Sequence, residues 1–392
     1  MRDALLWCGV LAALVGHGLL WTGVASRLHG LKGPRPAIKG LTALCVAVFV
    51  GLPAWAAWQW RDSVAAVASG PAAGGPLAAY VWACAALGAG GLFVKPWLER
   101  RRHDRRVLAA WTQEPQEVAR QLGRKPLAGT YARLLGALPG NEAGSLVVDR
   151  KTLIVPKLPM ELDGLTIAHL SDLHLTGRID RAYYGCLAAA VNHLRPDVVA
   201  VTGDIIENEQ CRSWLDEALG RLCAPLGVYY VLGNHDAFID LQQTRHQLDE
   251  LGLCYLGGRC KRVEWNGASV LLTGNEQPWQ AAPPAESLPT RSASGGEFRL
   301  ALCHSPDQFA WCCRADMDLV LAGHTHGGQV QLPVLGVVLC PSLHGGKYAC
   351  GVFCRGSTVM HVSRGLGGQT PLRWRCPPEL ALLSLQASPA VR

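Results

Sequence analysis

Residues 165–175 read LTIAHLSDLHL and hold the pattern that decides the fold prediction, a short apolar run over residues 165–170 that is followed by Asp172 and His174. Short apolar runs rich in β-branched residues are typical of buried strands. The pattern recurs further along the chain, where other apolar runs also end in polar residues. These runs cover residues 197–201, 228–232, 298–302 and 318–321. The sequence therefore predicts a series of strands that each end in Asp, His or Asn.

Helical segments fit between several of these strands, for example over residues 183–194 and 210–222. Strand, helix, strand order is typical of a largely parallel α/β sheet, which places its sites at the carboxyl ends of its strands. We therefore expect the polar residues after the strands to meet at one edge. They are Asp172, His174, Asp204, Asn234, His304, His324 and His326.

Carboxylate, amide and imidazole groups suit one or two divalent ions such as Mn, Fe, Zn or Co. Asp172-x-His174 and His324-x-His326 each bring two such donors to a turn at the end of a strand. Asp204 is the only other carboxylate at one of these strand ends, so we expect it to bridge two ions. A glycine precedes three of the seven residues, which lets the backbone turn tightly under a packed site.

The full set of motifs resembles that of the calcineurin-like metallophosphoesterases. The motifs are Asp172-x-His174, Gly203-Asp204, Gly233-Asn234-His235-Asp236, His304 and Gly323-His324-x-His326. The resemblance covers residues 150–386 and is strongest to the bacterial membrane-associated or exported phosphodiesterases typified by YkuE and YaeI. The segments that carry this second likeness are residues 165–175, 323–332 and 363–367. The resemblance implies a four-layer αββα fold, two sheets flanked by helices, with a centre of two metal ions.

The resemblance also implies a role for each motif residue. The first metal would be bound by Asp172, His174, Asp204 and His326, and the second by Asp204, Asn234, His304 and His324. His235 would be the catalytic histidine rather than a ligand, and Asp236 would orient it by a hydrogen bond or salt link.

These residues suit the hydrolysis of a phosphate ester. Two cations would lower the pKa of a bridging water, creating hydroxide near neutral pH, and would stabilise charge on the phosphoryl oxygens. His235 would then protonate the leaving group or donate a hydrogen bond to it. Further candidates for contacts with phosphate are Asn208, Arg178 and Arg364, since an arginine can donate two parallel hydrogen bonds to such a group.

The first 98 residues predict a membrane anchor. They contain only nine charged side chains, which leave uncharged stretches at residues 4–25, 41–60 and 76–94. About 20 helical residues cross a ~30 Å hydrocarbon core, so about three transmembrane helices are expected. Over the whole chain, charged residues make up 17% and hydrophobic residues 49%. A cleaved signal peptide over residues 1–26 is the alternative, although two further apolar stretches follow it.

Basic residues predict the orientation of this anchor. The loop after the first span contains Arg27, Lys32, Arg35 and Lys39, and residues 99–106 contain five arginines against two acids. The loop between the second and third spans has only Arg61, balanced by Asp62. The positive-inside rule then places the catalytic domain on the cytoplasmic side of the inner membrane, with the exported side as the alternative. The 15 cysteines form no disulfide scaffold and are expected to be free thiols, which agrees with a reducing compartment.

We therefore expect a membrane anchor over residues 1–98, a basic juxtamembrane connector over 99–150, a catalytic domain over 151–386 and a tail over 387–392. The predicted function is hydrolysis of a phosphodiester or pyrophosphate bond. The membrane and the family favour a lipid-linked substrate such as UDP-2,3-diacylglucosamine. The alternatives are a phosphoprotein or nucleotide phosphatase, and a membrane scaffold with a non-catalytic hydrolase-like domain.

The sequence also bears on the partners of the chain. The net charge is only +7 and no basic stripe is interleaved with aromatic residues, so no nucleic-acid partner is expected. The bilayer and a phosphate-ester substrate are the expected partners. The sequence determines neither the identity of the metals nor the oligomeric state.

Overall fold

The computed structural model describes residues 2–59, 75–100, 102–284, 288–291 and 296–388. The chain divides into two compact units. The helical unit consists of residues 1–101 together with residues 331–347. The catalytic unit consists of residues 102–330 and 348–392. Each unit is described by itself below.

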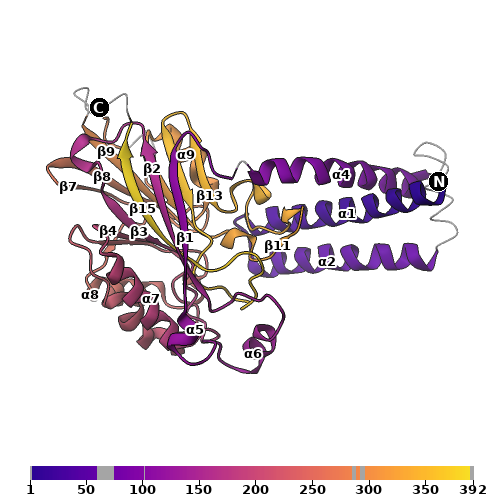
Figure 1. Ribbon diagram of the computed structural model, residues 1–392, viewed down its shortest axis with the longest axis horizontal. Helices are drawn as coiled ribbons and strands as arrows, with labels where there is room; N and C mark the ends of the chain where they lie inside the picture. The colour runs from indigo at the N-terminus through magenta and orange to yellow at the C-terminus, as the bar shows by residue number, and fades with distance from the viewer. Residues whose placement is uncertain (1, 60–74, 101, 285–287, 292–295, 389–392) are drawn as a thin grey trace. The chain divides into compact units, whose positions relative to one another are not determined.

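Three long helices make up most of the helical unit and lie side by side in Figure 1. They are α1 (Arg2–His29), α2 (Arg35–Trp58) and α4 (Gly75–Arg100). Each contains a stretch of 23 to 26 residues that is long and apolar enough to cross a membrane. This agrees with the three expected spans. The expected Arg61 and Asp62 pair lies outside the described residues.

The close packing of α1 against α4 depends on small residues. A Cβ atom on Gly16 would lie 1.8 Å from the carbonyl oxygen of Cys84, and one on Gly88 would lie 1.9 Å from that of Ala12. Any larger side chain at either glycine would therefore push the two helices apart. Small residues spaced four apart are a common way for apolar helices to approach this closely.

The first sheet of the catalytic unit has seven strands in the order β1-β2-β15-β3-β4-β5-β6. In that order they are β1 (Leu108–Gln116), β2 (Leu146–Val155), β15 (Glu379–Ala387), β3 (Thr166–Leu170), β4 (Val198–Thr202), β5 (Val228–Val231) and β6 (Cys254–Tyr255). Strands β3 to β6 are parallel to one another, whereas β15 is antiparallel to β3 and β1 is antiparallel to β2.

The second sheet has six strands in the order β13-β14-β10-β9-β8-β7. They are β13 (Gly351–Arg355), β14 (Thr358–Val362), β10 (Leu319–Ala322), β9 (Glu297–Cys303), β8 (Ala268–Asn275) and β7 (Cys260–Trp265). The four central strands are parallel and the two edge strands are antiparallel. Both sheets are thus mixed: the expected parallel strands run from β3 to the edge strand β6 in the first sheet and form the centre of the second. A short hairpin of β11 (Gln331–Leu332) and β12 (Gly336–Val337) belongs to the helical unit.

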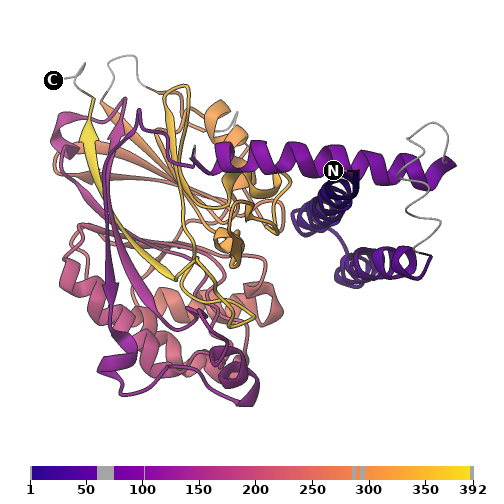
Figure 2. The same ribbon diagram turned by 45° about the vertical axis from the view of Figure 1, so that its right-hand side comes forward.

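Three hydrophobic clusters separate the four layers of the catalytic unit. One cluster lies between the first sheet and the helices α7 (Arg181–Leu194) and α8 (Leu241–Glu250). The second fills the space between the two sheets, and the third lies between the second sheet and α9 (Phe309–Arg314). Figures 1 and 2 show these helices on the outer faces of the two sheets. The αββα architecture expected from the resemblance is therefore confirmed.

The alternating directions of side chains along one strand explain how a single sheet lines two cores. In β4, Val199 and Val201 point into the cluster beneath α7, while Val198 and Ala200 point into the cluster between the sheets. All four side chains are fully buried. Because both faces are covered, the strand is a continuous apolar run rather than an alternating one.

Most of the expected juxtamembrane connector, residues 99–150, is folded into the catalytic unit. Strand β1 pairs with β2, which begins at Leu146, and α5 (Val118–Gln121) and α6 (Thr130–Gly136) lie between them in the chain. The sequence does not predict this strand, because β1 is exposed along almost all of its length and its residues therefore lack an apolar pattern. The helix expected over 210–222 is instead a 3₁₀ turn (Glu209–Trp214) followed by a π turn (Asp216–Gly220).

Candidate metal centre

The expected ligands all stand directly after strands of the two sheets. Asp172 and His174 follow β3, Asp204 follows β4, Asn234 follows β5, His304 follows β9, and His324 and His326 follow β10. The two sheets bring these strand ends together, so residues up to 154 positions apart come to share one site. The expected convergence at the carboxyl ends of the strands is therefore observed.

Backbone conformation marks this site as unusual. Five of the expected ligands have a positive φ, in the left-handed region that non-glycine residues rarely adopt. They are Asp172, His174, Asp204, His324 and His326, with φ between 47° and 70°. Such conformations cost about 1–3 kcal/mol each and persist only where the surrounding structure imposes them. The strain therefore indicates that the loops are shaped to present side chains rather than to minimise their own energy.

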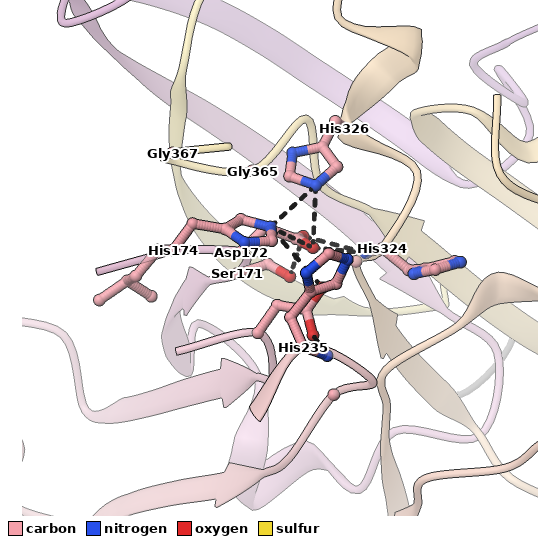
Figure 3. A network of polar contacts seen from close by, with 12 residues as sticks. Ser171, Asp172, His174, His235, His324, His326, Gly365 and Gly367 are labelled. Atoms are coloured by element: carbon pink, nitrogen blue, oxygen red, sulfur yellow. Dashed lines mark hydrogen bonds and ion pairs between the residues drawn. The ribbon is translucent and has the colours of Figure 1, made fainter. Parts of the chain in front are cut away.

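One group of four donors forms the first part of the site. It consists of Asp172, His174, Asp204 and His326, whose donor atoms all lie within 4.8 Å of one another. The Nε2 atoms of His174 and His326 are 3.0 Å apart. Each of these atoms faces a carboxylate, with Asp204 Oδ2 3.6 Å from the first and Asp172 Oδ1 3.6 Å from the second. Figure 3 shows the imidazoles of His174 and His326 converging on Asp172.

A second group shares Asp204 with the first. Donor atoms of Asp204, His304 and His324 also lie within 4.8 Å of one another. His304 Nε2 is 3.3 Å from Asp204 Oδ2 and 3.1 Å from the side-chain oxygen of Asn234. The indole of Trp279 covers this side, with its ring centroid 4.5 Å from that of His324.

Unsatisfied polar atoms test whether metal ions fit these donors. Both ring nitrogens of His324 are buried and have no hydrogen-bond partner in the part of the chain that the structure describes. The same holds for Asp204 Oδ2, whereas its Oδ1 accepts a hydrogen bond of 2.8 Å from the backbone N–H of His235. Buried polar atoms are nearly always paired, so these atoms need a further partner. Carboxylate and imidazole donors in this arrangement suit divalent cations.

Neighbouring groups fix which nitrogen of each imidazole faces the centre. His304 Nδ1 lies 2.8 Å from the carbonyl oxygen of Thr202, to which it donates its proton. His174 Nδ1 contacts Oε1 of Glu207 in the same way. In both rings Nε2 is then the nitrogen directed toward the site. A carbonyl or carboxylate on the far nitrogen is the usual support of a metal-bound histidine.

Asp172 is supported by a chain of buried hydrogen bonds. The hydroxyl of Ser171 donates to Asp172 Oδ2 over 2.6 Å and accepts from Thr202 over 2.8 Å. Thr202 in turn lies 2.9 Å from Nε2 of His169, which is fully buried inside β3. The backbone N–H of His324 also bonds both oxygens of Asp172, at 3.0 Å. These bonds tie the loops after β3 and β10 together.

The donors of this cluster differ in protonation. Burial holds the pKa of His324 and of His326 well below the ordinary histidine value, so both imidazoles are neutral and can act as ligands. Burial alone would raise the pKa of Asp204, but the imidazoles of His304 and His235 hold it well below its ordinary value. The same pairing raises the pKa of His304 to about 9, against the effect of burial. A bound cation would take over the charge that protonated His304 supplies here.

The catalytic histidine inferred from the resemblance has a different partner from the one expected. His235 Nδ1 lies 3.1 Å from Oε1 of Glu207. The carboxylate of Asp236 instead accepts hydrogen bonds from the backbone N–H groups of Ile205, Ile206 and Gly233, at 2.7 to 3.0 Å. Asp236 therefore joins the loops after β4 and β5, and the expectation that it orients His235 through its side chain is corrected. The reason is that Asp236 begins a helical turn that directs it inward, away from the ring.

The three candidates for phosphate contacts have varied positions. The side chain of Asn208 accepts from the N–H of Gln210 and donates to the carbonyl of Thr176, so it caps a turn. Arg364 is buried and pairs with Asp149. The two contacts of Asn208 indicate a structural role, whereas Nη2 of Arg364 is buried without a hydrogen-bond partner among the described residues, and a contact of either residue with phosphate stays a prediction. Arg178 is exposed, and its guanidinium donates to the carbonyl oxygen of Gln369 and lies 5.4 Å from the ring of Tyr131.

Several residues at the site were not anticipated. They are Glu207, Phe238, Trp279 and Arg373. Phe238 packs on the ring of His235, with 4.6 Å between centroids, and Arg373 Nη2 lies 3.3 Å from Nδ1 of His326. Only Glu207 had a usable signal, since it is an acid three residues after Asp204 in the same strand-end loop. Phe238 lies in the turn that Asp236 begins, two residues past the motif, whereas Trp279 and Arg373 reach the site from segments without a motif.

Two of the expected glycines are required by space. A Cβ atom on Gly233 would lie 2.1 Å from Oδ1 of Asp204, and one on Gly323 would lie 1.7 Å from the hydroxyl oxygen of Ser171. Neither distance is possible between real atoms. The tight turn expected at these positions is therefore a close approach of backbone to the ligand carboxylates and their supports.

Comparisons with known proteins agree with this geometry. Residues 165–328 match the family model of the calcineurin-like phosphoesterases. The uncharacterized metallophosphoesterase YkuE of Bacillus subtilis is 30% identical over 264 residues, which cover 66% of this chain and 90% of that protein. The phosphodiesterase YaeI of Escherichia coli is 27% identical, covering 56% of this chain and 81% of that protein. A transmembrane protein with metallophosphoesterase domain from Danio rerio is 30% identical, covering 54% of this chain and 51% of that protein.

Proposed function

Because the chain belongs to the calcineurin-like phosphoesterase family, we propose that it is a membrane-anchored hydrolase that cleaves a phosphodiester or pyrophosphate bond at a centre of two divalent metal ions. The observation that carries this proposal is the position of Asp204, whose carboxylate belongs to both groups of donors. Two cations held by these groups would therefore be neighbours, as in other two-metal hydrolases.

Membrane anchoring is supported by the three apolar helices and by the similarity to a transmembrane protein. The arginine-rich residues 99–106 favour a cytoplasmic position for the catalytic unit, in the cytoplasmic membrane. The 15 cysteines are free thiols, which fits a reducing compartment.

Divalent cations at this centre would supply Lewis acidity toward the phosphoryl oxygens and an acidified water as nucleophile. Asp172, His174, Asp204 and His326 would hold one of them, and Asp204, Asn234, His304 and His324 the other. His235 stands beside the donors, with its ring centroid 5.0 Å from that of His174 and 19% of its side chain exposed. With Nδ1 facing Glu207, the nitrogen left to protonate a leaving oxygen is Nε2.

A lipid-linked substrate is supported by the apolar surface around this site. Phe238, next to His235, is 38% exposed. On another side, the side-chain amide of Gln369 donates to Glu207 over 2.6 Å, and the backbone of Gln369 contacts Arg178. Arg178 in turn lies over Tyr131, whose side chain is 51% exposed on α6. A cation followed by exposed apolar groups suits a phosphate attached to an acyl chain.

Hydrolysis by the full-length protein in lipid nanodiscs with Mn²⁺ tests this proposal. We expect cleavage of bis-p-nitrophenyl phosphate in preference to the monoester. We also expect UDP-2,3-diacylglucosamine to be cleaved with a kcat/KM at least about tenfold above that of UDP-N-acetylglucosamine, because burial of only two methylenes is worth that factor. Asp204→Asn should abolish both activities, and Asp216→Asn, at an exposed aspartate of the same unit, should leave them unchanged.

Two outcomes would contradict the proposal at different levels. Equal cleavage of the acylated and non-acylated diphosphates would exclude a preference for a lipid-linked substrate, but the proposed phosphoesterase activity would still stand. An absence of cleavage with metal confirmed in the protein would favour a binding role for the catalytic unit.

A further inference from the structure

Residues 331–347 leave the catalytic unit and fold with the helices. They read QLPVLGVVLCPSLHGGK and contain one lysine and no acid. We call this stretch the collar. Because the collar belongs to the helical unit, the chain passes between the two units three times, at residues 101–102, 330–331 and 347–348. A connection that only tethers the catalytic unit would need one passage.

Backbone contacts hold the collar against the C-terminal turns of α1 and α4. The N–H of Cys340 donates to the hydroxyl of Ser26 over 3.0 Å, and the N–H of Ser342 donates to the carbonyl of Ser26 over 3.2 Å. On α4, the ammonium of Lys95 donates to the carbonyl of Val337. The collar is thus attached to both helices near the points where they end.

Gly30 allows the closest of these approaches. A Cβ atom at Gly30 would lie 2.6 Å from the backbone nitrogen of Leu343 and 2.9 Å from the carbonyl carbon of Ser342. Both atoms belong to backbone and cannot rotate away. The collar therefore fits against the end of α1 only because residue 30 has no side chain.

The collar has two different sides. Val337, Cys340 and Ser342 are buried, at 1% exposure or less. The apolar side chains between and around them are exposed. They are Leu332 at 37%, Val334 at 62%, Leu339 at 48% and Leu343 at 42%. A segment pinned by its backbone on one side thus presents branched aliphatic side chains on the other.

The position of the collar indicates what covers these side chains. The ends of α1 and α4 carry the cations Arg27, Lys95 and Arg100, and Lys32 and Lys39 follow within ten residues of the end of α1. Basic residues at the ends of apolar helices mark the boundary between hydrocarbon and water. Aliphatic side chains exposed at that level suit the outer part of the acyl layer, beneath anionic headgroups.

We propose that the collar is seated in the bilayer, with Val334, Leu339 and Leu343 inserted among the acyl chains. The proposal rests on the membrane anchoring in the proposed function and goes beyond it. Gln331 follows the expected metal ligand His326 by five residues, which span at most about 17 Å when fully extended. A collar in the leaflet therefore holds this ligand loop near the headgroups, where the phosphate of a lipid-linked substrate lies.

Photocrosslinking in the full-length protein tests the proposal. The photoreactive residue p-benzoylphenylalanine is placed singly at Val334 or Leu339, and the protein is reconstituted in phosphatidylglycerol nanodiscs and irradiated. Leu44 on α2, 58% exposed, is the positive control, and Met160 in the catalytic unit, 45% exposed, is the negative control. We expect lipid adducts at Val334 and Leu339 at yields close to that of Leu44.

The controls separate failure of this proposal from failure of the proposed function. Yields at Val334 and Leu339 no higher than at Met160, with normal labelling at Leu44, would overturn the collar alone. Absence of lipid adducts at Leu44 as well would overturn the membrane anchoring and the collar with it. Adducts to protein rather than to lipid at Leu339 would identify a protein partner instead and would also overturn the proposal.

A pair of glycine variants tests the attachment to α1. Gly30→Val should displace the collar and reduce lipid adducts at Leu339 severalfold, while those at Leu44 are unchanged. Gly40→Val is the matched control, because a Cβ atom at Gly40 meets nothing within 4 Å. Unchanged adducts at Leu339 in Gly30→Val would contradict the attachment. Ser26→Ala, which removes the acceptor of the Cys340 N–H without adding volume, provides a milder test of the same contact.

Discussion

The Nδ1 atom of His235 lies 3.1 Å from Oε1 of Glu207. The same oxygen contacts Nδ1 of His174, so one carboxylate supports both an expected metal ligand and the expected proton donor. Burial would raise the pKa of Glu207, but its bonds to the two imidazoles lower it to about 2. The carboxylate is therefore charged at any pH at which the protein would work, and it faces two rings with different tasks.

Glu207→Gln should lower kcat by about 10- to 100-fold, the range typical of removing the partner of a metal-bound histidine. The amide keeps the size of the side chain but loses the charge that orients both rings. The measurement is kcat and KM on bis-p-nitrophenyl phosphate, together with metal content. Glu209→Gln is the control, since Glu209 pairs with Arg212 at the surface. An unchanged kcat in Glu207→Gln would contradict this role.

His235→Ala should retain metal but lose on the order of 10²–10⁴-fold in kcat, the range expected for loss of a general acid. The imidazole belongs to neither four-residue group, although one of its nitrogens lies within 4.8 Å of donors of His174 and Glu207, so we expect metal content to stay that of the wild type. His246→Ala is the matched control, because His246 is exposed on α8. A metal-replete His235→Ala protein with normal turnover would exclude the assignment.

Asp204→Asn should lose both metal and activity. Among the described residues, its carboxylate alone belongs to both four-residue groups, and an amide is a poorer bridge between two cations. Metal content per chain, measured by mass spectrometry after gel filtration, should fall clearly below that of Asp216→Asn. Retention of wild-type metal content in Asp204→Asn would contradict the role of Asp204 as a ligand shared by the two metal ions.

Glu379→Gln should destabilise the catalytic unit by about 3–5 kcal/mol, because it leaves two buried cations, Lys151 and Arg364, with Asp149 as the one described carboxylate that still pairs with both. The carboxylate of Glu379 bonds Lys151 and lies 3.6 Å from Arg364, and all three side chains are buried. Urea unfolding in detergent, followed by tryptophan fluorescence, measures the loss. Glu264→Gln, at an exposed position of β7, should change stability little.

Acid should reduce the stabilisation from this buried pair. Burial would raise the pKa of Glu379, but Arg364 and Lys151 hold it well below the ordinary value. A carboxylate whose folded pKa is depressed stabilises the fold above its unfolded pKa of about 4.3, and the stabilisation is lost as pH falls further. The difference in the free energy of unfolding between wild type and Glu379→Gln should therefore have its full value at pH 7 and should shrink below about pH 4. If this difference stayed constant down to pH 3, the charge of Glu379 would not be the source of the stabilisation.

The strands of the site could be predicted because their signal is local. The apolar runs that end in Asp172, Asp204 and His304 correspond to β3, β4 and β9, each within one residue of the expected bounds. Strand β1 could not be predicted in this way, since it buries no face and so has no apolar periodicity. The sequence also did not predict that residues 331–347 fold with the helices. An apolar loop has the same composition whether it covers a core or the end of a helix.

The sequence by itself determined which chemical groups the chain can bring to a cation and where the apolar helices lie, because spacing and composition are properties of the chain alone. Only the tertiary structure decided the partners of those groups. Asp236 and Glu207 are both acids close to motif residues, and nothing in their spacing says which of them faces His235. That choice depends on the backbone direction of two separate loops, which becomes defined only when the strands between them pack into one sheet.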